Sequence, residues 1–202
     1  FTIEQMYDLV EEIRACDADT SIDGIVVTQG TDILEESSYF VDLCYGGSTP
    51  VVFTGAMRNP SLPSPDGPIN LLNSVYTATD PMAGEMGVMV VLNDRVYPAR
   101  DVTKTNTMNA DTFRSPEFGP IGVVEEGEVT WRRTPVNPDP SLDPTRDALT
   151  NEVFALTVTA DMAPSQIPSP GSCKGFCLAA TGAGHIPETL IEPLATLRDS
   201  GV

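Results

Sequence analysis

The chain has 202 residues, of which 41% are hydrophobic, so it is long enough to bury a substantial core in one or two domains. Its formal net charge of -18 argues against nucleic acid or an anionic membrane as a partner. It contains no apolar run of about eighteen residues, which argues against a membrane-spanning helix. Its first ten residues mix apolar and acidic side chains and do not resemble a signal peptide.

The strong acidity has two interpretations, an ordinary acidic enzyme or an adaptation to high salt. Lys104 and Lys174 are the only lysines among the eleven basic residues, and the acidic residues are dispersed along the chain. A dispersed acidic surface repels itself in dilute buffer, and dissolved salt screens that repulsion. We therefore expect a halophilic protein.

The four cysteines do not form the CxxC pairs of common zinc sites. A zinc site built from Cys173, Cys177 and His185 is the alternative to buried free thiols. We expect free thiols and no metal, which fits a reducing compartment and a cytoplasmic protein.

The first half of the chain alternates helices and strands. Thr2 and Gln5 form a capping box that begins the first helix. Strands are expected at residues 24–28, 50–54 and 87–92, and helices at residues 33–43 and 68–77. We expect Thr31 or Asp32 to cap the helix at residues 33–43. This alternation predicts an α/β fold with a parallel, Rossmann-like sheet in an N-terminal domain over residues 1–133.

The second half begins with a β-hairpin, and its composition then changes. Residues 121–124 and 128–131 read as the two hairpin strands. Residues 134–152 are rich in proline and polar side chains, which predicts a linker. A smaller α/β C-terminal domain is expected over residues 153–202. Its strands are expected at residues 153–159 and 176–180, and its helix at residues 187–198, followed by Gly201 as a cap. This domain looks truncated, because a parallel sheet needs further strands.

Reactive side chains follow the predicted parallel strands. Ligands bind beyond the carboxyl ends of such strands, where the loops at residues 30–32, 55–58 and 93–104 should meet. A threonine hydroxyl needs a base to become a nucleophile, and Lys104 is the candidate base for Thr31. Asp32 would hold the amine in place, and Gly30 would let a substrate approach the backbone. Taken singly, Thr31 and Asp32 read better as helix caps, and Lys104 as an ion-pair residue.

Six ordered segments carry a more specific signal. They are residues 23–32, 34–36, 55–58, 66–71, 92–94 and 99–107. Together they resemble the bacterial-type L-asparaginase (asparaginase/glutaminase) family, strongly over residues 20–131 and more weakly over residues 181–202. The resemblance implies hydrolysis of L-asparagine to L-aspartate and ammonia without a cofactor. It also implies a homotetramer of close dimers, with sites at the dimer interface.

The resemblance also implies roles for individual residues. Lys104 would be the base, Thr31 the hydroxyl that it activates, and Asp32 the group that binds the α-amino group of the substrate. The backbone carbonyl of Ala56 would face the side-chain amide, and Gly30 would line the site. The substrate is thus expected to be a small amino-acid amide.

Three departures from the family pattern bear on this expectation. The family's other catalytic threonine and a substrate-binding serine lie in segments that would precede Phe1, so we expect the printed chain to be inactive by itself. Gln29 and Ile33 stand where histidine and threonine are common, which suggests retuning. Ala183 stands where some members carry an asparagine that reaches a neighbouring subunit's site, which weakens any claim for glutamine.

Two other functions stay open. One is the glutamine-hydrolysing subunit of an archaeal tRNA-dependent amidotransferase, although the acidity argues against direct docking of tRNA. The other is a non-catalytic homologue that binds amino acids. The joint presence of Thr31, Asp32 and Lys104 disfavours this last function, because a binding protein needs no base.

Overall fold

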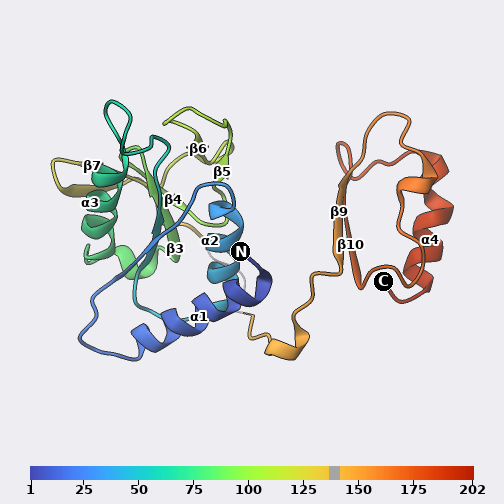
Figure 1. Ribbon diagram of the computed structural model, residues 1–202, viewed down its shortest axis with the longest axis horizontal. Coiled ribbons are helices and arrows are strands. Elements are labelled where there is room, and N and C mark those ends of the chain that lie inside the picture. The colour runs from blue at the N-terminus through green and yellow to red at the C-terminus, as the bar shows by residue number, and fades with distance from the viewer. Residues whose placement is uncertain (137–141) are drawn as a thin grey trace. The chain divides into compact units, whose positions relative to one another are not determined.

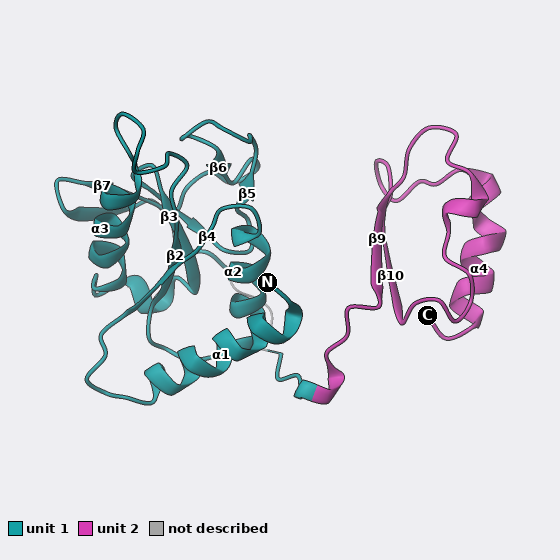
Figure 2. Cartoon of the chain, in the orientation of Figure 1, with its two compact units in different colours: residues 1–146 teal, residues 147–202 magenta. Residues whose placement is uncertain are grey.

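The computed structural model describes residues 1–136 and 142–202, which form two compact units (Figure 2). Unit 1 spans Phe1–Arg146 and unit 2 spans Asp147–Val202. The division falls inside the linker predicted at residues 134–152, and residues 137–141 of that linker lie outside the described residues.

Unit 1 is built on a six-stranded sheet with the order β1-β2-β3-β4-β7-β8 (Figure 1). The strands are β1 (Ile25–Thr28), β2 (Val51–Thr54), β3 (Val88–Leu92), β4 (Arg95–Pro98), β7 (Gly122–Glu125) and β8 (Glu128–Trp131). The first three are parallel, with Val26 opposite Val52 and Val52 opposite Met89. The α/β fold with a parallel sheet is therefore confirmed, and so is the predicted hairpin, which is β7–β8.

The sheet departs from the prediction after β3. Asn93 and Asp94 adopt φ values of 52° and 60°, the left-handed pair typical of a tight hairpin turn. The chain therefore reverses at once, and β4 runs antiparallel to β3 with Val90 opposite Tyr97. The prediction of one continuous loop from Asn93 to Lys104 was wrong, and the sheet is mixed rather than wholly parallel.

Three helices cover the two faces of this sheet (Figure 1). They are α1 (Ile3–Asp17), α2 (Leu34–Cys44) and α3 (Gly67–Ala78). The predicted capping box begins α1, because the Thr2 hydroxyl accepts from the Gln5 N–H and the Gln5 side chain accepts from the Thr2 N–H. Helices α1 and α2 share one core with Phe53 and Val90, whereas the end of α3 shares the other core with Val52. Alternate side chains of β2 and β3 thus enter opposite cores, as the strand geometry requires.

A second, two-stranded sheet carries Lys104. It consists of β5 (Thr103–Lys104) and β6 (Phe113–Arg114), which pair antiparallel. Val102 and Phe113 are 6% and 2% exposed and join the core beneath α2, so they anchor this excursion to the main body.

The last residues of unit 1 contact its helices. The Leu142 N–H donates to the Leu43 carbonyl at 2.6 Å, and Arg146 forms an ion pair with Asp8 at 2.6 Å. The Arg146 guanidinium also lies 4.9 Å from the centroid of the Tyr7 ring. Leu142 and Arg146, in the middle of the predicted linker, are therefore held against α1 and α2.

Unit 2 contains a pair of parallel strands and one α-helix. Its elements are β9 (Val153–Thr157), β10 (Gly175–Ala179) and α4 (Ile191–Asp199), with short 3₁₀ turns at Pro164–Gln166 and Glu188–Leu190. Outside this set, unit 1 has a 3₁₀ turn at Ala83–Glu85, and another at Arg146–Ala148 spans the division between the units. Leu190 and Leu197 are buried in a small core with Cys173. Gly201 ends α4 with φ 96°, as predicted.

Among the described residues, no helix is both long and apolar enough to cross a membrane.

Candidate active site

Thr31 and Asp32 lie in the turn that follows β1 and leads into α2. The residue at the N-cap of α2 is Ile33, and no side chain makes a capping hydrogen bond there. The expectation that Thr31 or Asp32 caps this helix was therefore wrong. Helix α2 begins at Leu34, so Thr31 and Asp32 both lie before its N-cap position. Both side chains form hydrogen bonds with another residue instead.

Both side chains meet Lys104. The Lys104 amine lies 2.9 Å from Thr31 Oγ1 and 3.0 Å from Asp32 Oδ1. The Lys104 side chain is only 16% exposed, whereas that of Asp32 is 97% exposed. The three residues singled out by sequence therefore converge, and a proton can pass between the Thr31 hydroxyl and the amine across a single hydrogen bond.

The turn after β2 lies against the turn after β1. A Cβ at Gly55 would lie 2.5 Å from the Gln29 carbonyl oxygen and 3.1 Å from Thr31 Cγ2. Only glycine permits this close approach of the two turns. Ala56 directly follows Gly55, so the approach also brings Ala56 near the Thr31 turn. A Cβ at Gly30 would meet no heavy atom within 4 Å, so the backbone at Gly30 borders open space.

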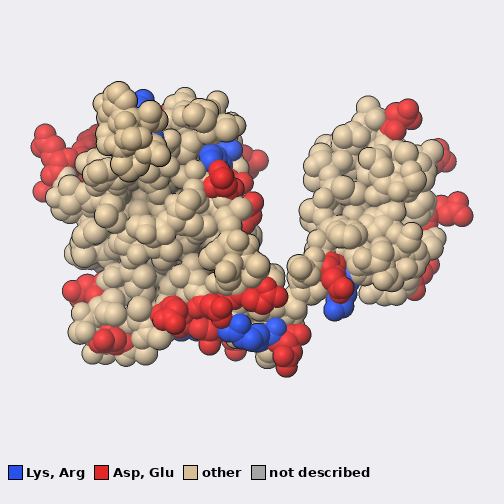
Figure 3. Space-filling model, viewed as in Figure 1, with Lys and Arg blue, Asp and Glu red and all other residues tan. Residues whose placement is uncertain are grey.

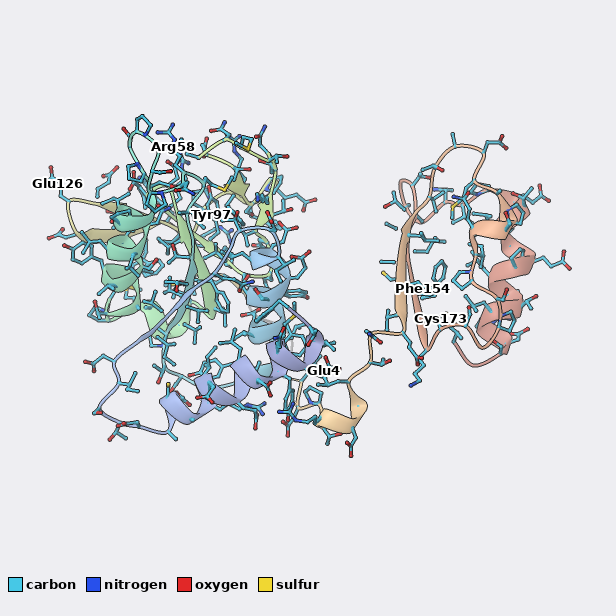
Figure 4. The ribbon with its side chains drawn as sticks, in the orientation of Figure 1. Glu4, Arg58, Tyr97, Glu126, Phe154 and Cys173 are labelled. Atoms are coloured by element: carbon cyan, nitrogen blue, oxygen red, sulfur yellow. The ribbon has the colours of Figure 1, made fainter. Side chains whose placement is uncertain are left out.

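Half-buried Asp66 and buried Asn70 brace the Ala56 turn. The Asp66 carboxylate accepts from the Met57 and Arg58 N–H groups at 3.0 and 2.8 Å. The Asn70 amide donates to the Gly55 carbonyl at 3.0 Å and to Asp66 at 3.2 Å. Arg58 lies at the end of unit 1 that carries these loops (Figure 4).

The sequence assigned no role to Asp66 or Asn70, although both lie in the segment at residues 66–71 that carries part of the family resemblance. The available signal for Asn70 was its place in a polar stripe at helical spacing, together with Asn73, Ser74 and Thr77 of the helix at residues 67–78. The sequence also gave no role to Gly55, although glycine directly after a buried strand often marks a close backbone approach.

A hollow of about 260 Å³ lies beside the converging side chains and is lined by Asp32 and residues 104–107. A larger hollow of about 1000 Å³ lies between α3 and the β7–β8 hairpin. Asp94, Glu125, Glu126 and Glu128 line that larger hollow, together with apolar side chains of α3. It contains no nucleophile paired with a base, so we place the candidate site at the smaller one.

The alternative zinc site in unit 2 does not form. Cys173 is buried and Cys177 is exposed, and both are free thiols. Across the described ranges, no three histidine, cysteine or acidic side chains gather in a group that could hold a metal ion.

Comparison with known proteins agrees with the geometry. Residues 1–137 match the family model described as "Asparaginase, N-terminal". The chain is 38% identical over 184 residues to "L-asparaginase 2" of Escherichia coli strain K12, covering 89% of this chain and 53% of that protein. It is 32% identical over 216 residues to "Glutaminase-asparaginase" of Pseudomonas aeruginosa, covering 100% of this chain and 57% of that protein.

A solved structure from Campylobacter jejuni, described as a "Probable Cytoplasmic L-asparaginase", superimposes with a TM-score of 0.91. It is 32% identical and is matched over 100% of this chain and 66% of its own. The present chain spans about half the length of the two curated relatives named above. The family model covers most of the chain, and the relatives agree with it. The chain therefore belongs to the asparaginase family.

Proposed function

We propose that this chain supplies the threonine-activating part of an enzyme that hydrolyses L-asparagine to L-aspartate and ammonia. The observation that carries the proposal is the 2.9 Å separation between the Lys104 amine and Thr31 Oγ1. The names of the relatives, which are asparaginases and glutaminase-asparaginases, point to the same amide substrates.

The proposed reaction uses the amine as a general base. Neutral Lys104 accepts the proton of the Thr31 hydroxyl, whose oxygen then adds to the carbon of the side-chain amide. The tetrahedral adduct collapses, and the leaving nitrogen takes the proton from Lys104 and departs as ammonia. Water then cleaves the resulting ester, which returns the threonine and releases L-aspartate.

The other residues of the site bind and orient the substrate in this proposal. Asp32 contacts Lys104 through one carboxylate oxygen, and its high exposure leaves the other available to a substrate's ammonium group. The turn braced by Asp66 and Asn70 supports an orienting role for the Ala56 carbonyl toward the substrate amide. The open space at Gly30 gives a substrate room beside the backbone.

The resemblance to asparaginases further implies a second threonine on a neighbouring strand. Strand β1 lies at an edge of the described sheet, so its outer backbone groups have no strand partner there. We propose this edge as the place where a further strand of the complete protein brings that threonine toward Thr31.

The test expresses the complete reading frame and measures ammonia release from asparagine and from glutamine. Lys104→Met is expected to reduce kcat by roughly 100- to 10,000-fold, the usual contribution of a general base. Lys174→Met is the matched control, because Lys174 is the chain's other lysine and its ion pair with Glu152 lies in exposed surface of unit 2. Full activity of Lys104→Met, or no ammonia release by the parent protein, would refute the proposal.

We also propose that the protein self-associates through the outer face of α3. Every outward-facing large side chain of this helix is apolar and is between 37% and 47% exposed. They are Ile69, Leu71, Leu72, Val75 and Tyr76. Exposed apolar surface of this extent is typical of interaction sites.

The charge pattern favours a second copy of the chain over a basic partner. Helix α3 carries no charged residue, although the chain has 29 acidic and 11 basic residues. In unit 1, acidic side chains gather along α1 and at the β7–β8 hairpin, whereas the surface over α3 is largely uncharged (Figure 3). The uncharged helix surface lets two acidic copies approach along α3, with the carboxylates of the neighbouring hollow at its border, and a two-fold dimer joins identical patches.

Sedimentation or light scattering on the complete protein tests this arrangement. Leu72→Asp is expected to shift the protein to a smaller assembly. Leu62→Asp is the control, because Leu62 is 51% exposed on the loop before α3. An unchanged mass for Leu72→Asp, or a monomeric parent protein, would contradict the proposal.

The remaining expectations become proposals of the same kind. We propose that residues 1–133 form the asparaginase N-terminal domain and residues 153–202 part of a C-terminal domain, joined by residues 134–152. We also propose a cytoplasmic location, supported by the four unpaired cysteine thiols. One relative, from Haemophilus influenzae, is named "Probable L-asparaginase periplasmic", so measuring the protein in separated cell fractions is the appropriate test.

A further inference from the structure

Lys104 reaches the site from a weakly supported strand. Within the described ranges, strand β5 pairs only with β6, in a sheet separate from the main one. The Thr105 N–H donates to the Thr112 carbonyl at 2.8 Å, toward β6. Because successive N–H groups of a strand point to opposite sides, the Lys104 N–H points away from β6. The backbone of the proposed base therefore needs an acceptor outside its own sheet.

Glu35 provides that acceptor. Its carboxylate accepts the hydrogen bond of the Lys104 N–H. Glu35 lies in the first turn of α2, three residues after Asp32, and its side chain is half-buried. A single carboxylate thus joins the backbone that carries the amine to the helix that follows the hydroxyl.

We infer that Glu35 is a positioning residue for Lys104, an inference that rests on the function proposed above. The lysine side chain is long and flexible, so its amine stays near Thr31 only if its backbone is held. Without Glu35, the Lys104 N–H loses its acceptor and β5 is held by β6 and the buried Val102. A misplacement of about 1 Å in such a site costs roughly 100-fold in rate.

Three substitutions of Glu35 distinguish the contributions of its side-chain length, its negative charge and its hydrogen bond to the Lys104 N–H. Glu35→Ala removes the acceptor, and we expect kcat to fall roughly 10- to 100-fold while KM changes less than about twofold. Glu35→Asp keeps the charge at the start of α2 but is one methylene too short, so we expect a similar loss. Glu35→Gln keeps both the length and an acceptor oxygen, so we expect it to restore most of kcat without moving the pH profile.

Glu36→Ala is the matched control. Glu36 is the next residue of the same first turn and is exposed. Its replacement by alanine removes the same charge from the same end of the helix. We expect its kcat within twofold of the parent protein. Urea unfolding followed by Trp131 fluorescence identifies any variant that fails to fold. If Glu35→Ala does not fold, the comparison of Glu35→Asp with Glu35→Gln tests the positioning role by itself.

The outcomes distinguish this inference from the proposed function. If Lys104→Met abolishes turnover while Glu35→Ala matches Glu36→Ala, the positioning role is wrong and the base assignment stands. If Glu35→Gln is no more active than Glu35→Asp, the hydrogen-bond argument is overturned. If Lys104→Met stays active, the proposed function itself fails, and with it the reason to position the amine.

Discussion

Replacing Asn70 with alanine should destabilise unit 1 strongly. Asn70 is 0% exposed, and its amide group joins three parts of the chain. It donates to the Gly55 carbonyl at 3.0 Å and to Asp66 at 3.2 Å, and it accepts from the Asn93 N–H at 3.1 Å. Each lost bond costs about 1 kcal/mol, and a buried group left without a partner costs about 1–3 kcal/mol. We expect the free energy of unfolding to fall by roughly 3 kcal/mol.

Urea unfolding followed by tryptophan fluorescence measures this loss. Trp131 is the chain's single tryptophan, lies in β8 and donates to Asp80 at 2.9 Å, so its emission reports on unit 1. Asn59→Ala is the control, because Asn59 is exposed and its side chain accepts hydrogen bonds from nearby Ser61, and we expect a change of about 0.5 kcal/mol. A loss below about 1 kcal/mol for Asn70→Ala would refute the claim that this amide braces the Ala56 turn.

An aspartate at the same position tests the electrostatic part of the argument. Asn70→Asp keeps the shape but replaces the donor with a second carboxylate beside Asp66, which lies 3.2 Å from the present amide nitrogen. Two carboxylates at this distance repel each other, so we expect the variant to be at least as unstable as Asn70→Ala near neutral pH. Mild acid should return part of that stability, because protonating one carboxyl restores a donor.

Two further predictions concern the response of the whole chain to pH and salt. Hydrogen bonds from the Thr49 side chain and then the Thr49 backbone hold the pKa of Asp17 below its ordinary value of 3.8. The folded carboxylate therefore adds stability that is present above that value and is lost as pH falls through the lower, folded pKa. Between about pH 5 and pH 3, the parent protein should lose more stability than Asp17→Asn, and parallel curves would contradict this. The urea midpoint should rise as sodium chloride is raised toward about 2 M, since salt screens the net charge of -18, and a falling midpoint would rule out salt adaptation.

The sequence predicted most of the main sheet because its strands carry strong local signals. Short runs of apolar and β-branched residues gave β1, β2 and β3, and the turn at Glu126-Gly127 gave the hairpin. Strand β4 was missed because Asn93-Asp94 was read as the start of a loop. Both residues take up left-handed backbone conformations, and the pair stands between two apolar runs, which is itself a hairpin signal.

The candidate site was only partly predictable, because its supports are contacts between distant segments. The rule for parallel sheets brought the loops of Thr31 and Ala56 to one edge. The same rule predicted that Lys104 lies near Thr31, but from a single loop after β3. In the structure the chain first reverses through β4, and Lys104 then reaches the site on β5. The bonds from Asn70 to the Gly55 carbonyl and from the Lys104 N–H to Glu35 cannot be predicted from local sequence patterns, because each joins a side chain to a backbone group 15 or more positions away.

Helix α3 shows why the direction of a helix face does not follow from periodicity alone. A stripe of apolar residues normally predicts the face that packs on the sheet. Here the polar stripe is buried instead, and each member has a partner. Asn73 donates to Asp94 at 2.8 Å, Ser74 to the Asn70 carbonyl at 2.7 Å, and Thr77 to the Asn73 carbonyl at 2.8 Å. Because these buried polar side chains of α3 all have hydrogen-bond partners, the inverted orientation of the helix costs little inside unit 1. The unfavourable part of this orientation is the apolar stripe that it leaves exposed to water on the outer face of α3. A second copy of the chain packed on this face would bury that stripe.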